Sequence, residues 1–511
     1  MELQCDVLVA GGGINGVAIA RDAAGRGLST ILCEQADLAS HTSSASTKLI
    51  HGGLRYLEHG EVGLVRKALR EREVLLRVAP HLVRPLRLVL VHDDSMRPAW
   101  MLQAGLWLYD ALAGRSRLPR SRRIDLARHP AGQELKGGFR TGFEFSDAST
   151  DDARLVVTAA IDAAGRGARI FTRSRLVRAR QDGSVWVADA TGQDGPQMRV
   201  RARSLVNATG PWAARFLRDV CGRESVRQLR LIKGSHLVVR RRFKHRFAYL
   251  LQSADRRIAF AIPFEDDFTL IGTTDVEVHQ EPDAAAIDTA ETEYLCELAN
   301  RYLKQPIGPA DIAWSFSGVR PLLDDGARPS ELTRDYALET DQDGAPLLTV
   351  WGGKITTFRT LAEEAVDRLA PRLGCTRGGW TSTAQMPGGA VLSRSGQVLK
   401  RAWGLEDLFS TMSEEYPWVP RPMLLRMVQA YGGLVITVLR SARGLEDLGA
   451  PVADGLYEAE LEYLVEREWA RSADDALWRR SKLGLRLSPE EQRRVADWFE
   501  RRLRADVGAR G

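Results

Sequence analysis

Three glycines, at positions 11, 13 and 16, follow a short apolar run near the start of the 511-residue chain. Residues 5–10 predict a buried strand, residues 14–26 an Ala-rich helix, and residues 28–34 a second strand that ends in an acid. Such a strand–turn–helix unit suits a dinucleotide, because glycines let the backbone approach a pyrophosphate and the helix N-terminus offers free N–H groups. Glu34 stands where a carboxylate accepts hydrogen bonds from an adenosine ribose.

FAD and NAD share this fingerprint, so other segments must decide between the two cofactors. A strand predicted at 204–210 ends in Ala-Thr-Gly, and a third, at 348–353, ends in two glycines before a helical start at Thr356. The second helix N-terminus could face a flavin and stabilise negative charge on its reduced ring. Either segment alone could be a structural strand end. Together the three strand ends indicate a tightly held flavin.

A second segment with chemical character spans residues 42–58 and combines hydroxyl side chains, two glycines, a His, a Lys and an Arg. These residue types make poor core material. They suit a loop that lies against a cofactor and an anionic ligand.

This segment closely resembles the FAD-dependent, aerobic bacterial glycerol-3-phosphate dehydrogenase family. The resemblance covers nearly the whole chain and includes TSSASTKLIHGGLRYLEH (42–59), LVNATGPW (205–212), LIKGSH (231–236), IGTTD (271–275), SGVRPL (317–322), TRDY (333–336), GGKITTFR (352–359) and RRSKLGL (479–485). It implies an α/β + α fold: a Rossmann-like FAD-binding domain of the D-amino-acid-oxidase-like superfamily, a mixed β-sheet substrate cap and a C-terminal helical domain. It also implies oxidation of sn-glycerol 3-phosphate to dihydroxyacetone phosphate by hydride transfer from C2 to flavin N5. The electrons would pass to a membrane quinone, ubiquinone or menaquinone.

The phosphate of this substrate calls for guanidinium groups, which bind oxygen pairs bidentately and keep their charge. Arg55, Arg320 and Arg334 lie in the matching motifs and are the candidates. Tyr56 is a candidate hydroxyl donor, and Thr274, in IGTTD, is a further expected substrate contact. The alternative for each arginine is a surface or structural ion pair.

The C2 hydroxyl must lose its proton as the hydride leaves, and His is the commonest base near neutrality. His51, four residues before Arg55, is the first candidate, and His236, at the end of LIKGSH, is the second. Water, or no discrete base, is the third possibility, and either histidine could instead be structural. Lys354 is expected to stabilise the developing alkoxide or the reduced flavin. With Arg320, these residues form the predicted catalytic set.

The residues expected to contact FAD gather at the strand ends and in the hydroxyl-rich loop. They are Gly11, Gly13, Ile14, Asn15, Gly16, Glu34, Thr42, Ser43, Ser44, Lys48, Leu49, Ala208, Gly210, Gly353, Lys354 and Thr356. Lys48 is expected to help position the cofactor. No metal site is expected, because the chain has no HExxH and no carboxylate cluster with ligand spacing.

The recurring flavin motifs require a discontinuous FAD-binding domain. The predicted boundaries are 1–78, 146–222 and 347–375 for the FAD-binding domain, 79–145 for an apolar helix and basic segment, 223–346 for the substrate cap and 385–511 for the C-terminal helical domain. Residues 375–390 predict a linker. Ser488 and Glu491 form a predicted capping box that opens a helix. We expect the last domain to support a homodimer or a partner contact.

An apolar stretch at 98–114 has Asp110 as its only charge and is followed by five arginines in nine residues. A helix of this length would measure about 26 Å, too short for a hydrocarbon slab of about 30 Å. The combination favours a segment in the headgroup plane, held by apolar burial and anionic lipid. We therefore expect a cytoplasmic protein attached peripherally to the inner face of the cell membrane. The alternative is a buried helix beside a solvated basic loop.

Composition excludes disordered and fibrous classes, since 44% of residues are hydrophobic and 27% charged. The first predicted strand starts so early that we expect no signal peptide. The nearest alternative function is a soluble glycerol-3-phosphate oxidase that uses oxygen and releases hydrogen peroxide. A D-amino-acid or hydroxyacid oxidase is more distant, because a carboxylate seldom needs three arginines. A flavoprotein sensor or basic nucleic-acid-binding module is least favoured, and no nucleic-acid partner is expected, because the arginine run lacks interleaved aromatics.

Overall fold

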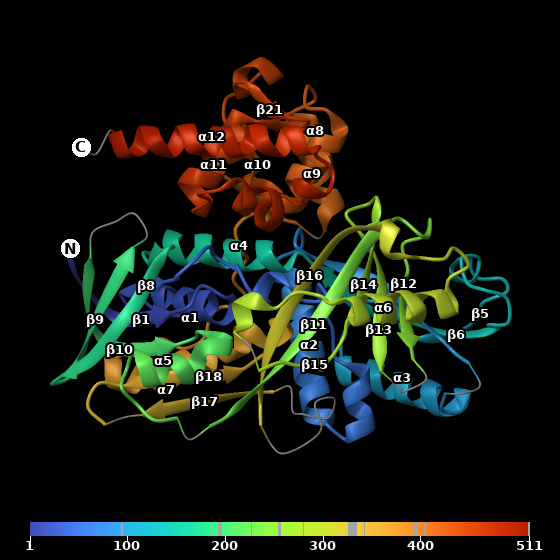
Figure 1. Ribbon diagram of the computed structural model, residues 1–511, viewed down its shortest axis with the longest axis horizontal. Helices are drawn as coiled ribbons and strands as arrows, with labels where there is room; N and C mark the ends of the chain where they lie inside the picture. The colour runs from blue at the N-terminus through green and yellow to red at the C-terminus, as the bar shows by residue number, and fades with distance from the viewer. Residues whose placement is uncertain are drawn as a thin grey trace.

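The chain forms two large β-sheets, each flanked by helices, and a helical domain at the C-terminus (Figure 1). The computed structural model describes residues 1–93, 96–192, 197–225, 227–253, 257–279, 281–324, 335–341, 343–392, 397–402 and 404–508. Arg334, one of the three predicted phosphate ligands, lies outside the described residues.

The first sheet has the predicted Rossmann-like core, in the order β17-β18-β10-β1-β2-β7, with β9 on β10 and β8 on β9. Along β1 the side chains alternate, so that Val7 and Val9 pack on the helices of one face and Leu8 and Ala10 pack on the other. The strands are β1 (Glu2–Ala10), β2 (Thr30–Cys33), β7 (Arg169–Phe171), β8 (Ser174–Asp182), β9 (Val185–Gly192), β10 (Met198–Asn207), β17 (Tyr336–Asp341) and β18 (Leu347–Gly352). The helices are α1 (Ile14–Gly25), α4 (Asp152–Gly165), α5 (Ala213–Asp219) and α7 (Phe358–Leu373).

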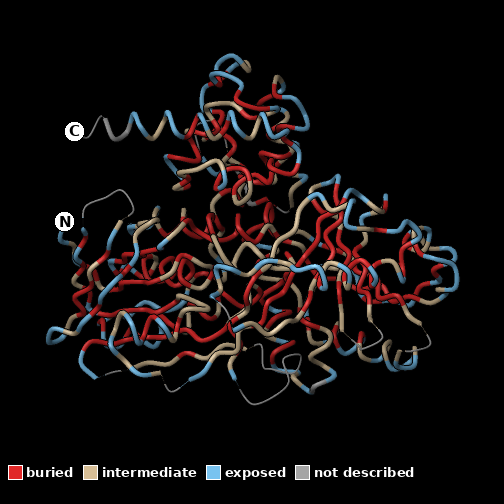
Figure 2. Tube along the Cα trace, viewed as in Figure 1, coloured by how far each residue is buried: buried red, intermediate tan, exposed pale blue. Residues whose placement is uncertain are grey.

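The second sheet forms the cap, in the order β15-β11-β14-β13-β12-β4-β6-β3, with β16 on β11 and β5 on β6. One face packs on α6, and the other packs on α2 and α3. Figure 2 shows the buried trace running through the strands of both sheets. The strands are β3 (Leu49–Ile50), β4 (Val83–Val91), β5 (Arg122–Asp125), β6 (Thr141–Thr150), β11 (Leu229–Arg240), β12 (Ala248–Gln252), β13 (Ile258–Phe264), β14 (Phe268–Gly272), β15 (Val276–Glu277) and β16 (Ile312–Leu323). The helices are α2 (Val62–Val78), α3 (Ala99–Ala113) and α6 (Thr289–Tyr302).

The cap recruits strands from outside the predicted cap segment, 223–346. β4, which begins the predicted membrane segment, pairs in parallel with β12 and antiparallel with β6. Conversely, β17 falls within 223–346 but pairs with β18 in the first sheet. The physical reason for these differences is that periodicity indicates which residues form a strand, whereas the partner strand is chosen by contacts far away in the chain.

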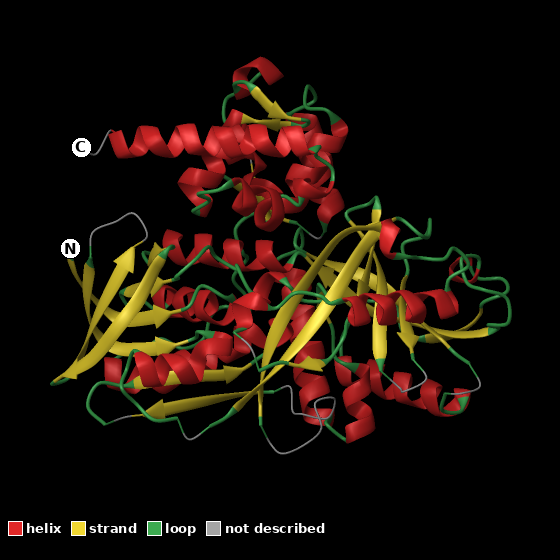
Figure 3. Cartoon of the chain, viewed as in Figure 1, coloured by secondary structure: helices red, strands yellow, loops and turns green. Residues whose placement is uncertain are grey.

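The C-terminal domain is mainly helical, as predicted, with two short strand pairs (Figure 3). The predicted capping box is present: Ser488 N donates to Glu491 Oε2 at 2.9 Å and Glu491 N donates to Ser488 Oγ at 3.3 Å. The elements are β19 (Ala390–Leu392), β20 (Val398–Arg401), α8 (Leu405–Glu415), α9 (Arg421–Tyr431), α10 (Val435–Leu439), β21 (Pro451–Ala453), β22 (Leu456–Tyr457), α11 (Glu458–Glu468) and α12 (Pro489–Gly508).

The predicted linker at 375–390 is packed rather than free, since the Arg166 guanidinium lies 3.9 Å from the centre of the Trp380 ring. Trp380 Nε1 also donates to the Asp22 carbonyl at 3.3 Å. Among the described residues, one helical stretch, Arg421–Leu439, is long and apolar enough to cross a bilayer. It is 72% buried inside the protein, as is typical of a core helix.

Candidate active site

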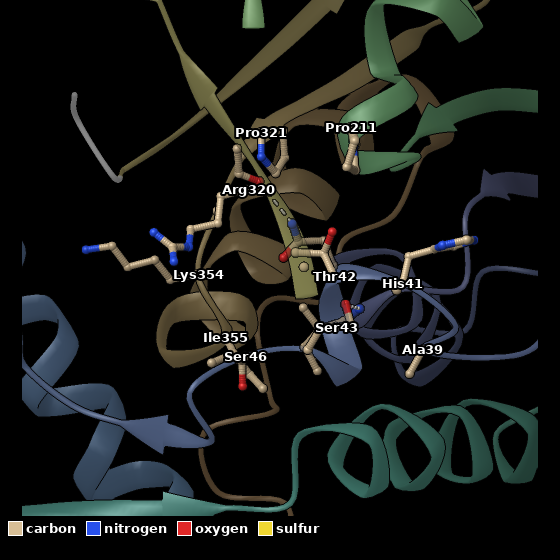
Figure 4. A pocket seen from close by; sticks show the side chains of 18 of the residues that line it. Ala39, His41, Thr42, Ser43, Ser46, Pro211, Arg320, Pro321, Lys354 and Ile355 are labelled. Carbon is tan, nitrogen blue, oxygen red and sulfur yellow. Dashed lines mark hydrogen bonds between the residues drawn. The ribbon is translucent and has the colours of Figure 1, made fainter. Parts of the chain in front are cut away.

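One cavity of about 540 Å³ is lined by residues of both sheets and collects most of the predicted site residues. Those that line it are Gly11, Gly13, Ile14, Asn15, Glu34, Thr42, Ser43, Leu49, His51, Arg55, Tyr56, Ala208, Gly210, His236, Arg320, Gly353, Lys354 and Thr356. Predicted residues that do not line it are Gly16, Ser44, Lys48 and Thr274. In Figure 4, Arg320 and Lys354 approach from one side, His41 and Ala39 lie opposite, and Thr42 and Ser43 lie between them.

Two glycines at the junction of β1 and α1, Gly11 in the turn and Gly16 in the first turn of the helix, leave no room for a Cβ. Gly11 has φ +109°, and a Cβ there would lie 2.5 Å from the Ala208 carbonyl oxygen. A Cβ on Gly16 would lie 1.9 Å from the Gly11 carbonyl oxygen, so glycine at this position allows the helix to pack closely against the turn. The first N–H groups of α1 lack partners within the helix and are directed toward this turn. The turn therefore leaves room for a pyrophosphate.

Glu34 closes one end of this turn. Its Oε2 accepts the Gly12 N–H at 2.6 Å and its Oε1 accepts the Ala36 N–H at 2.8 Å. Burial raises the pKa of this carboxyl, and the two backbone donors act against that rise. Each oxygen keeps a second lone pair, which a ribose hydroxyl could use.

The hydroxyl-rich loop is fixed from behind by Lys48. The Lys48 ammonium is buried, lies 2.6 Å from Asp152 Oδ1 and donates to the Ser44 carbonyl at 2.9 Å. In front of it, Ser43 Oγ accepts the Ile14 N–H at 3.0 Å, which joins the loop to the start of α1. Lys48 thus acts on the cavity through the loop.

Asn15 connects the start of α1 with the segment that leads into α7. Asn15 Nδ2 donates to the Gly352 carbonyl at 3.2 Å, and its buried Oδ1 has no partner in the described part of the chain. Gly353 has φ +107°, and a Cβ there would lie 2.9 Å from Asn15 Nδ2. The 3₁₀ turn Ile355–Thr357 then leads into α7. The glycine turn between β1 and α1 (the glycine cradle), Glu34 and the turn before α7 together fit an extended dinucleotide such as FAD.

Five residues with positively charged side chains line the cavity, and three of them, Arg55, Arg320 and Lys354, are predicted site residues. Arg320 pairs with Asp275 and donates to Thr273 Oγ1 at 2.9 Å, which fixes its guanidinium. Arg55 has no hydrogen bond or ion pair within the described residues and keeps its donors for a ligand. The Lys354 ammonium lies 3.9 Å from the centre of the Tyr56 ring. These cations suit a phosphate or another compact anion.

Both candidate histidines line the same cavity. The His51 N–H lies 3.4 Å from Thr356 Oγ1, and the His51 ring packs edge-on toward Phe260. The His236 ring stacks on Phe316, and its Nε2 lies 3.0 Å from Thr47 Oγ1. Burial, followed by Arg320 and Lys48, lowers the pKa of His236 well below its ordinary value. His236 is therefore a neutral imidazole at physiological pH.

Thr274 faces away from the cavity and supports it indirectly. It donates to Glu291 Oε1 at 2.6 Å and accepts the Ser235 N–H at 2.9 Å. Sequence reasoning missed Asp275, which pairs with Arg320, although Asp275 lies in the recognised IGTTD segment. It also missed the buried Asp147, which lines the cavity and comes from β6. No local pattern marks Asp147, because its partners lie on other elements.

Comparisons with known proteins agree with this geometry. The family profile described as FAD dependent oxidoreductase matches residues 6–359, and the profile described as C-terminal domain of alpha-glycerophosphate oxidase matches residues 380–507. A glycerol-3-phosphate dehydrogenase of Pseudomonas aeruginosa is 50% identical over 498 residues, or 97% of this chain and 95% of that protein. A D-erythritol 1-phosphate dehydrogenase of Brucella abortus is 45% identical over 502 residues, or 97% of this chain and 98% of that protein.

A solved structure is similar over nearly the whole chain. The X-ray structure of a glycerol-3-phosphate dehydrogenase from Bacillus halodurans, complexed with FAD, aligns with a TM-score of 0.75 and 25% identity. The alignment covers 97% of this chain and 94% of that chain. These matches confirm the predicted fold class and the predicted FAD cofactor.

Proposed function

The chain belongs to the family of FAD-dependent glycerol-3-phosphate dehydrogenases, and we propose that it oxidises the C2 hydroxyl of sn-glycerol 3-phosphate to give dihydroxyacetone phosphate. The observation that carries this proposal is the convergence of Arg55, Arg320, His51 and His236 on the cavity that also holds the glycine cradle. Bound FAD would accept the hydride from C2 and pass two electrons to the acceptor.

The phosphate would be held by Arg55 and Arg320. Arg320 is oriented by Asp275, Thr273 and the Thr274 carbonyl, so its guanidinium would not have to reorient to meet the phosphate. Arg55 brings a charge that no described residue neutralises, and Tyr56 adds a phenol beside it. Arg334 remains the predicted third ligand.

The proton of the C2 hydroxyl would pass to His51, with His236 as the second candidate. Both rings line the cavity, and the neutral state of His236 leaves it able to accept a proton. Lys354 reaches the same cavity from the turn before α7, where its charge would stabilise the oxygen as the proton leaves. The apolar side chains of Leu250, Ile258 and Phe260 complete the lining and would limit water near the reacting carbon.

The electron acceptor is inferred from helix α3, because this helix exposes several large apolar side chains to solvent. Trp100 is 70% exposed and Trp107 is 64% exposed, and Met101 and Leu108, the next residues in sequence, are 37% and 44% exposed. Exposed arginines lie just before and just after the helix: Arg97, Arg115 and Arg117. A large exposed apolar patch with a cationic rim is typical of a helix in the headgroup plane. We infer that α3 rests on an anionic membrane at the inner face of the cell membrane.

A membrane site makes ubiquinone or menaquinone the acceptor within reach. The soluble oxidase that reduces oxygen is the less favoured alternative, because the full-length relatives at 45% identity or more that we cite are dehydrogenases. The homodimer suggested for the C-terminal domain remains a prediction.

The proposal is tested by mixing the purified yellow protein anaerobically with sn-glycerol 3-phosphate while the visible spectrum is recorded. We expect rapid bleaching of the flavin, and reoxidation on addition of a short-chain quinone. D-Erythritol 1-phosphate, the substrate named for the Brucella relative, serves as the competing polyol phosphate. If D-erythritol 1-phosphate bleaches the flavin and glycerol 3-phosphate does not, the proposed substrate is wrong. Stoichiometric hydrogen peroxide without a response to quinone would favour the oxidase.

A further inference from the structure

The loop after Glu34, residues 35–43, is the part of the chain that folds over the dinucleotide turn, and we refer to it as the cofactor loop. Gln35, His41 and Ser43 line the cavity, and the Ala39 N–H donates to the Gly12 carbonyl at 3.2 Å. Asp37, in the middle of this loop, points away from the cavity and is 2% exposed. The cofactor loop therefore has an inner side for the ligand and an outer side anchored by one carboxylate.

The groups that hold Asp37 come from the C-terminal domain. Arg480 Nη1 and Nη2 donate to the two Asp37 oxygens at 2.5 and 2.8 Å, and Arg479 Nε adds a bond of 2.7 Å. The two arginines end a π-helical turn, Asp475–Arg480, more than 440 residues away in sequence. A bidentate arginine–carboxylate pair is among the strong hydrogen-bonded contacts between side chains, and its planar geometry fixes the orientation of both groups.

The arginines are themselves fixed by further buried partners. Arg480 Nη2 donates to the Glu468 carbonyl at 2.6 Å, and the Glu468 carboxylate pairs with Arg154 of α4. Arg479 also donates to Asp475 at 2.5 Å, and Arg173, whose backbone N–H binds the Ala36 carbonyl, pairs with Asp475 at 2.7 Å. The network therefore reaches the cofactor loop at both Ala36 and Asp37. Figure 1 shows the C-terminal helices seated over α4.

We propose that the C-terminal domain is a cofactor-retention device: through Arg479 and Arg480 it holds Asp37 and so keeps the cofactor loop closed over FAD. A loop that is fixed before binding costs the ligand less conformational entropy, so the bound flavin dissociates less readily. This role concerns the cofactor alone and does not depend on the identity of the substrate.

Coupling free energies between two sites usually correspond to factors of about 5 to 150 in affinity. We expect Asp37→Asn, in the full-length protein, to raise the Kd for FAD by at least about tenfold. Arg480→Lys, which cannot form the bidentate pair, should do the same. The readout is flavin released on dialysis and the Kd for FAD of the stripped protein, so it does not rely on activity.

The matched control is Arg426→Lys. Arg426 also makes a buried bidentate pair, with Glu460 inside the C-terminal domain at 2.6 and 2.7 Å, and forms no hydrogen bond or ion pair with the cofactor loop among the described residues. We expect this variant to lower the thermal unfolding temperature while its Kd for FAD stays that of the wild type. Equal FAD affinity in Asp37→Asn, Arg480→Lys and wild type would overturn the proposal, and so would an equal loss in Arg426→Lys.

Hydrogen exchange on the unmodified protein supplies a second test, in case the variants do not fold. Coupling free energies are reciprocal. If docking of the C-terminal domain on the cofactor loop strengthens FAD binding, then bound FAD must strengthen that docking by the same factor. We expect removal of FAD to raise exchange both in the cofactor loop and in residues 468–485. If exchange rose in the cofactor loop alone and residues 468–485 did not respond, the two would be uncoupled and the proposal would fail.

Discussion

The backbone N–H of Gly52 donates a hydrogen bond of 2.8 Å to the phenol oxygen of Tyr109, so helix α3 touches the residue that follows His51. Tyr109 in turn donates to Asp147, at 2.8 and 2.9 Å to the two oxygens, and Arg72 pairs with the same carboxylate at 2.9 Å. Burial, followed by Asp147, raises the pKa of Tyr109 well above its ordinary value, so the phenol stays protonated. The helix with the exposed apolar face thus holds the backbone next to the candidate base, His51.

Tyr109→Phe is the first test of this relationship. The variant leaves the Gly52 N–H and Asp147 without their phenol partner, which should cost about 1–3 kcal/mol of stability. Because the loop that carries His51 would shift, we also expect flavin reduction by glycerol 3-phosphate to slow by about tenfold or more. Stopped-flow absorbance under anaerobic conditions measures this rate.

Tyr249→Phe is the matched control, since its buried phenol donates to the Ala131 carbonyl in the cap core and does not line the cavity. It should lose similar stability and keep its rate of flavin reduction. A Tyr109→Phe protein that reduces flavin as fast as Tyr249→Phe would show that the contact is structural only.

Arg320 should matter for the substrate more than for the cofactor. We expect Arg320→Ala to raise KM and lower kcat together, by at least about tenfold in kcat/KM, because the proposed phosphate ligand is lost. FAD content should remain that of the wild type. Arg242→Ala, which removes a cap arginine paired with Asp311 outside the cavity, is the control. Loss of flavin from Arg320→Ala would instead assign this residue to the cofactor site.

Much of the fold could be predicted because its signals are local. The apolar run, the three glycines and the acid specify β1, α1 and β2, and the capping box specifies the start of α12. The contacts that organise the site are not local. Asp37 and Arg480, or Gly52 and Tyr109, meet only when separate elements pack, and neither partner carries a sequence pattern that names the other. For the same reason the predicted cap missed β4 and β6.

The two histidines can be distinguished by replacing each with asparagine, which keeps a polar side chain without a basic ring. If His51 is the base, His51→Asn should slow anaerobic flavin reduction by about 10²–10⁴-fold. His92→Asn, outside the cavity, should not change it. The low pKa of His236 predicts that a mechanism through His236 keeps its rate well below pH 6.5. An unchanged rate in His51→Asn, with a slow His236→Asn, would transfer the role to His236.

The exposed face of α3 predicts binding to lipid. Replacing Trp100 and Trp107 together by serine removes the two most exposed aromatic side chains of the helix, and vesicle binding should fall by about tenfold or more. Co-sedimentation with phosphatidylglycerol-containing vesicles measures this, at low and high salt. Val177→Ser, at an exposed apolar position on β8, is the control. Equal sedimentation of the double variant and the control would remove α3 as the membrane contact.

His81 should make the protein sensitive to acid. Its ring is 1% exposed, and neither ring nitrogen has a partner in the described part of the chain. Burial, followed by Arg154 and Arg84, lowers its pKa from 6.5 to about 3. The unfolded chain therefore takes up a proton that the folded chain refuses, so this contribution to stability is complete above pH 6.5 and is lost as pH falls from 6.5 toward 3. From pH 7.5 to pH 5 the loss is about 2 kcal/mol.

We therefore expect His81→Phe to unfold at a temperature that falls less than that of the wild type between pH 7.5 and pH 5. Phenylalanine fills the same space and cannot titrate, so the proton uptake by the unfolded chain at this position disappears. Differential scanning calorimetry at the two pH values gives the comparison, with the exposed His279→Gln as the control that should follow the wild type. Parallel shifts in all three proteins would mean that His81 does not carry this part of the pH dependence.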